Sequence, residues 1–444
     1  MVKIKLSFIT LLLFSSAAVS FSQSGWIVQP SGVTENLYSI FFINPNTGWA
    51  CGNNGKILST VNGGYNWNER TSNTSQNLFS IFFLNQNTGW ACGGTNSLPY
   101  MQCILKTTNG GTIWQTIYNQ APAYPVVFSD IFFTDANTGI VIGASKVALV
   151  SYGLIWKTTN GGQSWAGVTS DSLARTSLSF ANSSTGYIAC SYYIDYYDLF
   201  TYNSYVFKTT NFGINWNPVY SVSNKSITVL TSPDINNVIG GGMSITSSGI
   251  IYKTQNGGSS WQEVNPDSSG EIISISAPSA NFVWATTYNK KILASTNGGL
   301  NWYFQINPVN AVLNNLFFTD NLTGWAVGNS GTILKTTTGG VVGIKPISNE
   351  FPQSFFLSQN YPNPFNPVTK IKFDIPPSKG VRGMTVRLII YNTLGGEITT
   401  LVNRQLSPGT YEAEWDASNH PSGVYFYRLT AGKYTEAKKM VLVK

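Results

Sequence analysis

The chain has 444 residues, of which 10% are charged and 14% aromatic, and it contains 42 glycines. This composition excludes a disordered charged protein, a coiled coil and a helix-rich enzyme, and it is typical of a turn-rich, all-β protein. Because residues 24–340 hold 12 basic and 12 acidic residues, the net charge of +7 belongs to the two ends, and the neutral central region gives no electrostatic basis for binding nucleic acid.

Residues 1–22 have the pattern of a secretory signal peptide. Lys3 and Lys5 precede the apolar run of residues 6–14, and small or polar residues follow as far as Ser22. The apolar run is too short to cross a bilayer, and no later stretch approaches 18 uninterrupted apolar residues. We therefore expect cleavage after Ser22 and no transmembrane segment; an uncleaved anchor helix is the alternative.

A repeated unit organises residues 23–343. Its first part is an apolar strand, clearest at 37–42, which an Asn-Thr-Gly turn connects to a second strand. Its second part is a third strand and a hairpin with the pattern Ser/Thr-x-Asn-x-Gly-x-x-Trp. Six copies of this pattern end at Trp67, Trp114, Trp165, Trp216, Trp261 and Trp302, at steps of 41 to 51 residues. Such repetition predicts a β-propeller of four-stranded blades.

The seventh copy of the unit lacks its tryptophan. Residues 335–343 repeat the pattern but place Gly343 where the tryptophan should stand, whereas Trp26 precedes the first complete unit. We predict that the N-terminal strand completes the last blade and closes a seven-bladed propeller, because closure removes the free edges of the sheets.

The tryptophan-ended hairpin resembles the Asp-box of sialidase-like, sortilin-like and photosystem II assembly factor-like propellers, with Asn where that family usually has Asp. The resemblance implies a fold but no activity, because these hairpins are structural in the family. A sialidase needs three arginines to hold the carboxylate of its substrate, and residues 24–340 contain only Arg70 and Arg175. This count argues against sialidase activity.

A glycoside hydrolase would need two carboxylates that face each other across a cleft. Asp135 and Asp320 hold equivalent turn positions, Asp130 lies in an innermost strand without an evident partner, and Asp195 and Asp198 lie in a loop. We therefore assign no catalytic residue and no cofactor. A secreted polysaccharide-cleaving glycoside hydrolase remains the alternative function.

The four cysteines do not have metal-ligand spacing, and the single histidine, His420, lies far from them in the sequence. No metal site is expected. Aligned by repeat, Cys92 and Cys103 fall opposite each other on adjacent strands, and an exported chain meets an oxidising environment. We predict a disulfide between them; buried free thiols are the alternative.

The connections between the second and third strands are long in four consecutive blades, at 93–102, 143–154, 191–205 and 240–249. They build up one side of one face, and binding residues are often placed on such loops. The third loop carries Tyr192, Tyr193, Tyr196, Tyr197 and Tyr202. Tyrosine offers a flat apolar ring with a polar tip, which suits sugar rings or protein surfaces. We predict a binding site here; tyrosines that only cover one another are the alternative.

The composition changes after a linker at 344–354. Alternating strands at 370–375, 386–391, 410–415 and 424–429 predict a small Ig-like β-sandwich over residues 355–444. An Ig-like adhesive module is the alternative reading of such a sandwich.

This C-terminal segment closely resembles the sorting domain of the type IX secretion system. The matching motifs are Asn-Tyr-Pro-Asn-Pro-Phe-Asn-Pro (360–367), Tyr-Asn-Thr-Leu-Gly-Gly-Glu (391–397), Pro-Ser-Gly-Val-Tyr (421–425) and Lys-Lys-Met-Val-Leu (438–442). The resemblance implies transport across the outer membrane by the type IX machinery, often followed by removal of the domain. The sequence as a whole predicts a propeller that is secreted or attached to the outer cell surface and binds an extracellular glycan or protein without catalysing a reaction.

Overall fold

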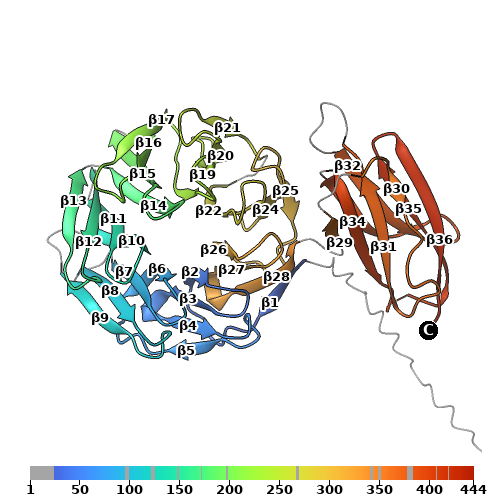
Figure 1. The fold of residues 1–444 in the computed structure, drawn as a ribbon, viewed down its shortest axis with the longest axis horizontal. Coiled ribbons are helices and arrows are strands. Elements are labelled where there is room, and N and C mark those ends of the chain that lie inside the picture. Colours follow the sequence, from blue (N-terminus) through green and yellow to red (C-terminus); the bar gives the residue numbers. More distant parts are fainter. Residues whose placement is uncertain are drawn as a thin grey trace, which may run out of the picture.

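The computed structural model describes residues 25–95, 100–121, 126–147, 150–171, 173–196, 199–266, 270–340, 344–348, 352–377, 384–406, 408–418 and 420–444. The first part, to residue 340, forms seven four-stranded sheets arranged as blades around an axis (Figure 1). The second part forms two four-stranded sheets. The predicted all-β fold class is confirmed.

Within each blade the strands are antiparallel. In blades 1 to 6 they follow the chain order from the axis outward, and in blade 7 the outermost strand is β1. Blades 1 to 3 comprise β2 (Leu37–Phe42), β3 (Gly48–Gly52), β4 (Ile57–Thr60) and β5 (Asn68–Arg70); β6 (Asn77–Phe83), β7 (Gly89–Thr95), β8 (Met101–Thr107) and β9 (Gln115–Gln120); and β10 (Val126–Phe133), β11 (Gly139–Val147), β12 (Val150–Thr158) and β13 (Ala166–Asp171). Blades 4 to 6 comprise β14 (Ala174–Phe180), β15 (Gly186–Tyr196), β16 (Leu199–Thr209) and β17 (Asn217–Ser223); β18 (Val229–Thr231), β19 (Val238–Met243), β20 (Gly249–Thr254) and β21 (Gln262–Val264); and β22 (Ile272–Ser276), β23 (Val283–Thr287), β24 (Ile292–Ser295) and β25 (Tyr303–Gln305). Blade 7 comprises β26 (Leu313–Phe318), β27 (Gly324–Gly328), β28 (Ile333–Gly340) and β1 (Gly25–Gln29), and short 3-10 turns η1 (Asn53–Gly55) and η2 (Asn329–Gly331) follow β3 and β27.

The repeated Ser/Thr-x-Asn-x-Gly-x-x-Trp pattern builds the hairpin between the third and fourth strands. In blade 1, Thr60 Oγ1 accepts the N–H of Gly64 at 2.9 Å and donates to Asn62 Oδ1 at 3.0 Å. The same Asn62 oxygen accepts the N–H of Asn66 at 3.0 Å. Equivalent bonds recur at Thr107, Thr158, Thr209, Thr254 and Ser295. Because one side-chain oxygen makes both bonds, Asn can replace Asp in this hairpin.

Aromatic rings fill the seams between neighbouring blades. Phe42, at the end of an innermost strand, stacks on Trp325 of the preceding blade with ring centroids 3.6 Å apart. Its other contact is edge-on with Trp67, the hairpin tryptophan of its own blade, at 5.9 Å. Phe83 and Phe133 repeat both contacts. The buried rings remove a large apolar area from water and fix each blade against the next.

Strand β1 supplies the fourth strand of blade 7. It pairs antiparallel with β28, and Val28 lies opposite Leu334. Trp26 is only 2% exposed and meets Phe318 edge-on at 5.7 Å. This contact has the geometry of Trp67 on Phe42, so Trp26 takes the place of the tryptophan that the seventh repeat lacks.

The C-terminal sandwich consists of the sheets β29-β34-β31-β30 and β33-β32-β35-β36. Their strands are β29 (Ile344–Ser348), β30 (Phe356–Leu357), β31 (Val368–Ile375), β32 (Met384–Tyr391), β33 (Glu397–Leu406), β34 (Gly409–Asp416), β35 (Gly423–Ala431) and β36 (Tyr434–Leu442). Residues 344–348, which the sequence analysis placed in the linker, instead form β29 and pair with β34. An edge strand tolerates Pro346, because one of its sides needs no hydrogen-bond donors, and the proline hid this strand from the sequence pattern.

Candidate functional site on the hairpin face

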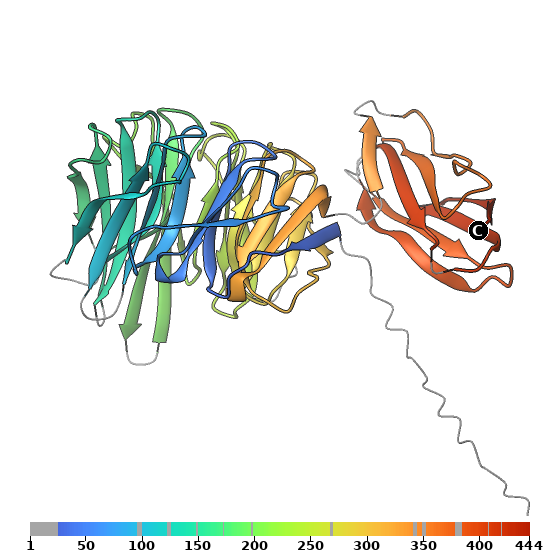
Figure 2. The same ribbon diagram turned by 90° about the horizontal axis from the view of Figure 1, so that it is seen from below.

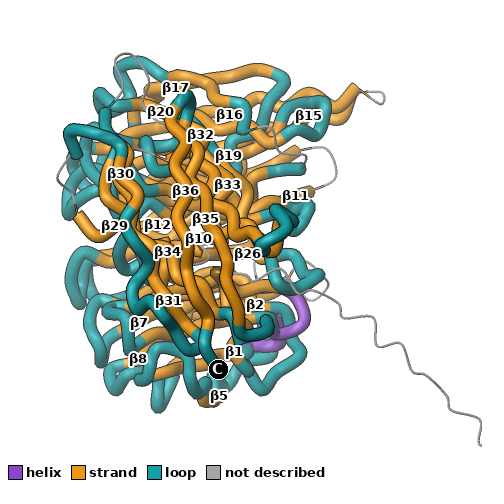
Figure 3. The backbone as a smooth tube through the Cα atoms, turned by 90° about the vertical axis from the view of Figure 1, so that its right-hand side faces the viewer, coloured by secondary structure: helices purple, strands orange, loops and turns teal. Residues whose placement is uncertain are grey.

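The β15–β16 hairpin of blade 4 has the longest strands among the described propeller residues. Its two strands pair with each other without a bulge as far as Tyr196 and Leu199. The flanking strand β14 pairs with β15 only as far as Ser191, and β17 pairs with β16 only as far as Asn203. The outer part of the hairpin is therefore a two-stranded ribbon that projects from the propeller (Figures 2 and 3). In this ribbon the backbone N–H and C=O groups of the two strands bond to each other, whereas in an irregular loop they would bond to water.

The predicted tyrosine site falls on this ribbon. Tyr192, Tyr193 and Tyr196 lie on β15, and Tyr202 lies on β16 directly opposite Tyr193. The backbone thus brings these four positions together at the projecting end of blade 4. The side chains of these four tyrosines and the whole of Tyr197 lie outside the described residues, so their role in binding stays a prediction.

The neighbouring blades continue this face, because every connection between a second and a third strand lies at the same end of its blade. In blade 3, β11 and β12 pair as far as Val147 and Val150. In blade 2, β7 and β8 pair as far as Thr95 and Met101. Blade 5 has a short turn closed by the N–H of Ser247, which donates to the carbonyl of Ser244. The long loops inferred for blades 2, 3 and 4 are therefore extended hairpins, and the hairpin of blade 3 is next to the β15–β16 ribbon.

Near the axis, the innermost strands carry a polar residue at a β-bulge in six of the seven blades. The residues at this bulge position are Ser39, Ser80, Asp130, Ser177, Ser274 and Asn315. Five of them accept a backbone N–H from the innermost strand of the next blade, at 3.0 to 3.2 Å. The bond from Ile40 to Asn315 joins blade 1 to blade 7 across 275 residues of sequence. The bulge leaves a backbone N–H of the innermost strand available, and the polar side chain of the neighbouring blade accepts its hydrogen bond.

Asp130 is the acidic residue in this ring. Its carboxylate accepts bonds from Ser80 Oγ at 2.8 Å, from the N–H of Ile131 at 2.9 Å and from the N–H of Leu178 at 3.0 Å. Burial raises the pKa of the Asp130 carboxyl to about 6, although these three donors favour the ionised form. Asp130 therefore connects three blades.

The other carboxylates discussed for catalysis are turn residues where the structure describes them. Asp135 Oδ1 accepts the N–H groups of Asn137 and Thr138 at 2.7 and 2.8 Å. Asp320 accepts the two equivalent N–H groups. The Asp195 side chain and the whole of Asp198 lie outside the described residues.

The two arginines of the propeller brace strands. Arg175 is 3% exposed and donates to Thr169 Oγ1 at 3.2 Å and to the carbonyl of Leu173. Arg70 Nε donates to Ser59 Oγ at 2.8 Å. In the parts of the chain that the structure describes, no three His, Cys, Asp or Glu side chains are grouped so that they could hold a metal ion.

The predicted Cys92–Cys103 disulfide is wrong. The strand register places Cys103 opposite Gly93 and Cys92 opposite Ile104. Side chains at successive positions point to opposite faces of a sheet, so the two thiols lie in different seams, with Cys103 toward blade 1 and Cys92 toward blade 3. All four cysteines are free and buried, and burial raises the pKa of the Cys103 thiol to about 12. The repeat alignment holds, because Cys51 pairs with Ile57 in blade 1 as Cys92 pairs with Ile104 in blade 2, and only the assumed pairing across the hairpin was one residue out.

In the C-terminal sandwich, the Asn-Tyr-Pro-Asn-Pro-Phe-Asn-Pro motif binds the last strand. The N–H of Phe365 donates to the carbonyl of Val441 at 3.0 Å, and the N–H of Val443 donates back to the carbonyl of Phe365 at 2.9 Å. Asn363 Oδ1 accepts the N–H of Val441 at 3.0 Å. The motif thus holds the C-terminal strand β36 to the rest of the sandwich.

Asn360 anchors the same motif in the core of the sandwich. It is 2% exposed, and its amide donates to Thr369 Oγ1 at 2.9 Å and to the carbonyl of Pro362 at 3.0 Å. Its backbone N–H donates to the hydroxyl of Tyr427 at 2.8 Å. A buried amide whose groups are satisfied in this way explains why the motif needs Asn at this position.

The repeated blades define an Asp-box type of propeller, and the motif just described defines a sorting domain behind it. Residues 18–337 match the family of the photosynthesis system II assembly factor YCF48, and the chain belongs to this family. Residues 359–444 match the secretion system C-terminal sorting domain. Both resemblances seen in the sequence are thereby confirmed. No curated protein matches the chain.

Solved structures with the same fold include "YCF48 bound to D1 peptide", with 18% identity and a TM-score of 0.53, covering 72% of this chain and 98% of that one. Another is YCF48 from Cyanidioschyzon merolae, with 18% identity and a TM-score of 0.51, covering 70% and 98%. The WD40 propeller domain of Doa1 is 11% identical, with a TM-score of 0.50, and covers 70% and 96%. Similarity at this level shows the fold alone.

The sorting domain establishes where the protein goes. Its presence indicates export by the type IX machinery, and the protein is secreted or attached to the outer cell surface. Within the described ranges, no helix is long and apolar enough to cross a membrane.

Proposed function

We propose that this protein is a secreted propeller that binds an extracellular glycan or protein on the face carrying the β11–β12 and β15–β16 hairpins. The observation that carries the proposal is the β15–β16 ribbon, which extends beyond both of its flanking strands. A rigid scaffold that presents a projecting segment on one side is a common arrangement for binding. The tyrosine-rich sequence of this segment supplies the contact chemistry.

A polypeptide segment is one ligand class to test, since one solved propeller of this family's fold carries a peptide. A glycan is the other class, because tyrosine rings also stack on sugars. The proposal includes removal of the signal peptide 1–22 and delivery of the propeller, at 23–343, by the C-terminal domain. Sequencing the N-terminus of the exported protein would test the cleavage after Ser22.

The test replaces Tyr193, Tyr196 and Tyr197 together by Ala in the full chain. Binding is measured on a glycan array and by pull-down of proteins from the surface of the producing cells, followed by titration of each hit. We expect the affinity for the true ligand to fall about tenfold or more, because stacking area is lost. The melting temperature should stay within about 2 °C of wild type, because the ribbon lies outside the packed blades.

The matched control replaces an exposed tyrosine elsewhere, Tyr65 in the β4–β5 hairpin of blade 1, which is 75% exposed. This variant should bind like wild type. Equal affinity in all three proteins would refute the proposed site, and cleavage of a bound glycan would favour the alternative of a glycoside hydrolase.

A further inference from the structure

Two hollows on the outer wall of blades 2 to 4 meet at one tryptophan. The first, of about 410 Å³, lies between β9 and the β12–β13 hairpin, and the second, of about 480 Å³, lies between that hairpin and the hairpin of blade 4. Ser164 and Trp165 line both of them. The hollows therefore adjoin each other at these two residues, and we call the pair the Trp165 groove.

Aromatic rings form the floor of the Trp165 groove. Trp156 on β12, Trp165 directly before β13 and Tyr118 on β9 are all half-buried. Trp165 is held by an edge-on contact with Phe133, with ring centroids 6.0 Å apart. Tyr118 meets Trp156 at 5.5 Å. The rings are thus fixed by packing before any ligand arrives, which lowers the entropic cost of binding.

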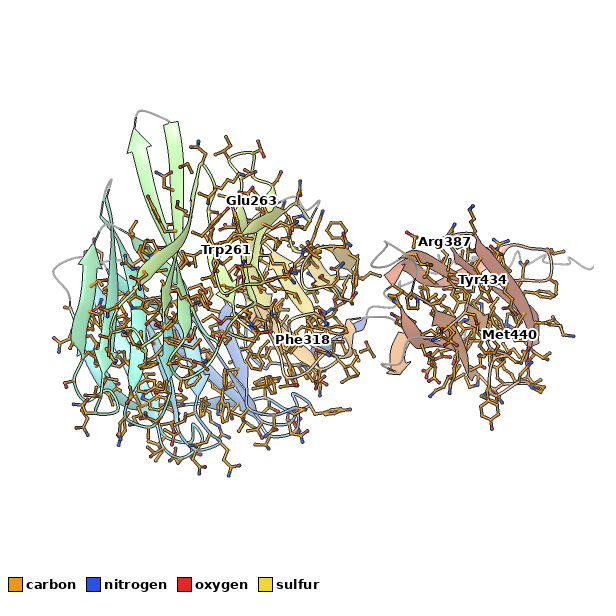
Figure 4. All side chains as sticks on the ribbon, turned by 45° about the horizontal axis from the view of Figure 1, so that its top comes forward. Trp261, Glu263, Phe318, Arg387, Tyr434 and Met440 are labelled. Carbon is orange, nitrogen blue, oxygen red and sulfur yellow. The ribbon has the colours of Figure 1, made fainter. Side chains whose placement is uncertain are left out.

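The corresponding seam between blades 4 and 5 is filled. There Tyr220, which follows its hairpin tryptophan at the same spacing as Tyr118, stacks on Trp261 with centroids 5.2 Å apart. Its hydroxyl donates to Glu263 Oε1 at 3.3 Å, beside the labelled Trp261 (Figure 4). In the Trp165 groove, Tyr118 instead donates to Gln102 Oε1 at 3.4 Å. The two seams therefore differ in how the tyrosine is held: Tyr220 stacks on Trp261 and bonds to Glu263, whereas Tyr118 bonds to Gln102.

The walls of the groove are mostly neutral and combine polar side chains with the apolar Ile117, Val168 and Ile214. Exposed amide and hydroxyl side chains surround the rings, namely Thr116, Asn119, Gln120, Thr159, Gln163 and Ser164. The charged side chain among the lining residues, Lys157, already donates to the carbonyl of Phe212 at 3.0 Å. Neutral donors and acceptors around fixed aromatic rings match a ligand that has many hydroxyl groups and flat C–H faces.

We infer that the Trp165 groove is a second binding site, which takes a neutral oligosaccharide. The two halves on either side of Trp165 suit at least two consecutive sugar units of a chain, with one unit stacked against the indole. This site lies on the outer wall and is separate from the hairpin face of the proposed function. An experiment can therefore refute one of the two sites without refuting the other.

The test titrates the full chain with neutral hexasaccharides of glucose, xylose, mannose and N-acetylglucosamine, and follows tryptophan fluorescence and calorimetric heat. The first variant, Asn119→Ala with Gln163→Ala, changes only exposed side chains. The second, Trp165→Leu, removes the stacking ring. Matched controls at the filled seam are Asn217→Ala with Gln262→Ala, and Trp261→Leu, which reproduces the packing loss of Trp165→Leu.

We expect saturable binding of at least one hexasaccharide, weakened about tenfold or more by both groove variants and unchanged in both controls. The ligand-induced fluorescence change should disappear in Trp165→Leu and persist in Trp261→Leu. Binding by none of the sugars, or equal affinity in groove and control variants, would overturn the inference. Binding lost only in the Tyr193, Tyr196 and Tyr197 variant would support the proposed function alone and also overturn the groove.

Discussion

At the scale of single residues, Asp130 shows how an acid can serve the structure of a propeller. In a neutral, aromatic-rich region a buried carboxylate needs strong partners, and Asp130 finds three of them on three blades. Asn315 holds the equivalent place in blade 7, where it accepts the N–H of Ile40 and donates to Ser274 Oγ at 3.3 Å. An uncharged amide can therefore also form hydrogen bonds that join neighbouring blades at this position.

This comparison leads to a pH prediction for Asp130→Asn. The pKa of Asp130 is raised from 3.8 to about 6 on folding, so the folded state binds the proton more tightly than the unfolded state. The contribution of Asp130 to the free energy of unfolding is then largest below pH 4 and falls as the pH rises through 6, by at most about 3 kcal/mol. Denaturant unfolding at pH 4.5 and 7.5 should show this difference in the wild type.

The Asp130→Asn variant should lose that component of the pH dependence. Carboxylates such as Asp135, whose pKa is lowered by backbone hydrogen bonds, act in the opposite direction, but they are common to both proteins and cancel in the comparison. If the two proteins show the same change in stability between the two pH values, Asp130 does not titrate as described.

At the scale of elements, the hairpin motif explains a departure from the family pattern. Asn62 uses one oxygen to accept from both Thr60 and Asn66. We expect Asn62→Asp to keep the stability of the wild type, because a carboxylate offers the same acceptor. Asn62→Ala should lower the free energy of unfolding by about 1 to 2 kcal/mol, since the N–H of Asn66 loses its partner. Urea unfolding of the three proteins would check this, and equal loss in both variants would contradict it.

The secondary-structure elements also show which features of the fold can be predicted from the sequence. The strand order, the hairpins and the turn role of Asp135 follow from short-range signals, such as apolar runs and Asn-Gly turns, which act within a few residues. Strand register does not follow in the same way. An error of one residue in the assumed pairing across the hairpin was enough to place Cys92 and Cys103 on the same face, whereas they lie on opposite faces.

The candidate sites also show that the sequence predicts local features better than features formed by distant segments. The sequence located the tyrosine-rich segment of blade 4, because the cluster lies in one short stretch of chain. It did not locate the Trp165 groove, whose lining residues come from blades 2, 3 and 4 and share no local pattern. The signal that could have helped is the pair Trp156 and Trp165, because most blades carry Leu or Phe at the position of Trp156.

At the scale of the whole molecule, Trp26 joins the first strand of the propeller to the last blade. Replacing Trp26 by Ala should lower the free energy of unfolding by about 3 to 5 kcal/mol, because it leaves a cavity against Phe318 where the seam should be filled. Ile27→Ala on the same strand is the control, since Ile27 is 63% exposed and should cost little. Calorimetric or denaturant unfolding measures both, and a Trp26→Ala protein as stable as Ile27→Ala would contradict the packing described.

The pairing of Gly25 with Gly340 has a further consequence for biogenesis. Strand β1 is synthesised before the other strands of the propeller, and its indole has no strand to pack against until β28, more than three hundred residues later, is complete. A chain that stops before β28 would leave β1 without its pairing strand and the ring of Trp26 uncovered. Because β28 precedes the sorting domain at residues 359–444, a chain that carries the sorting domain already contains every strand of the propeller.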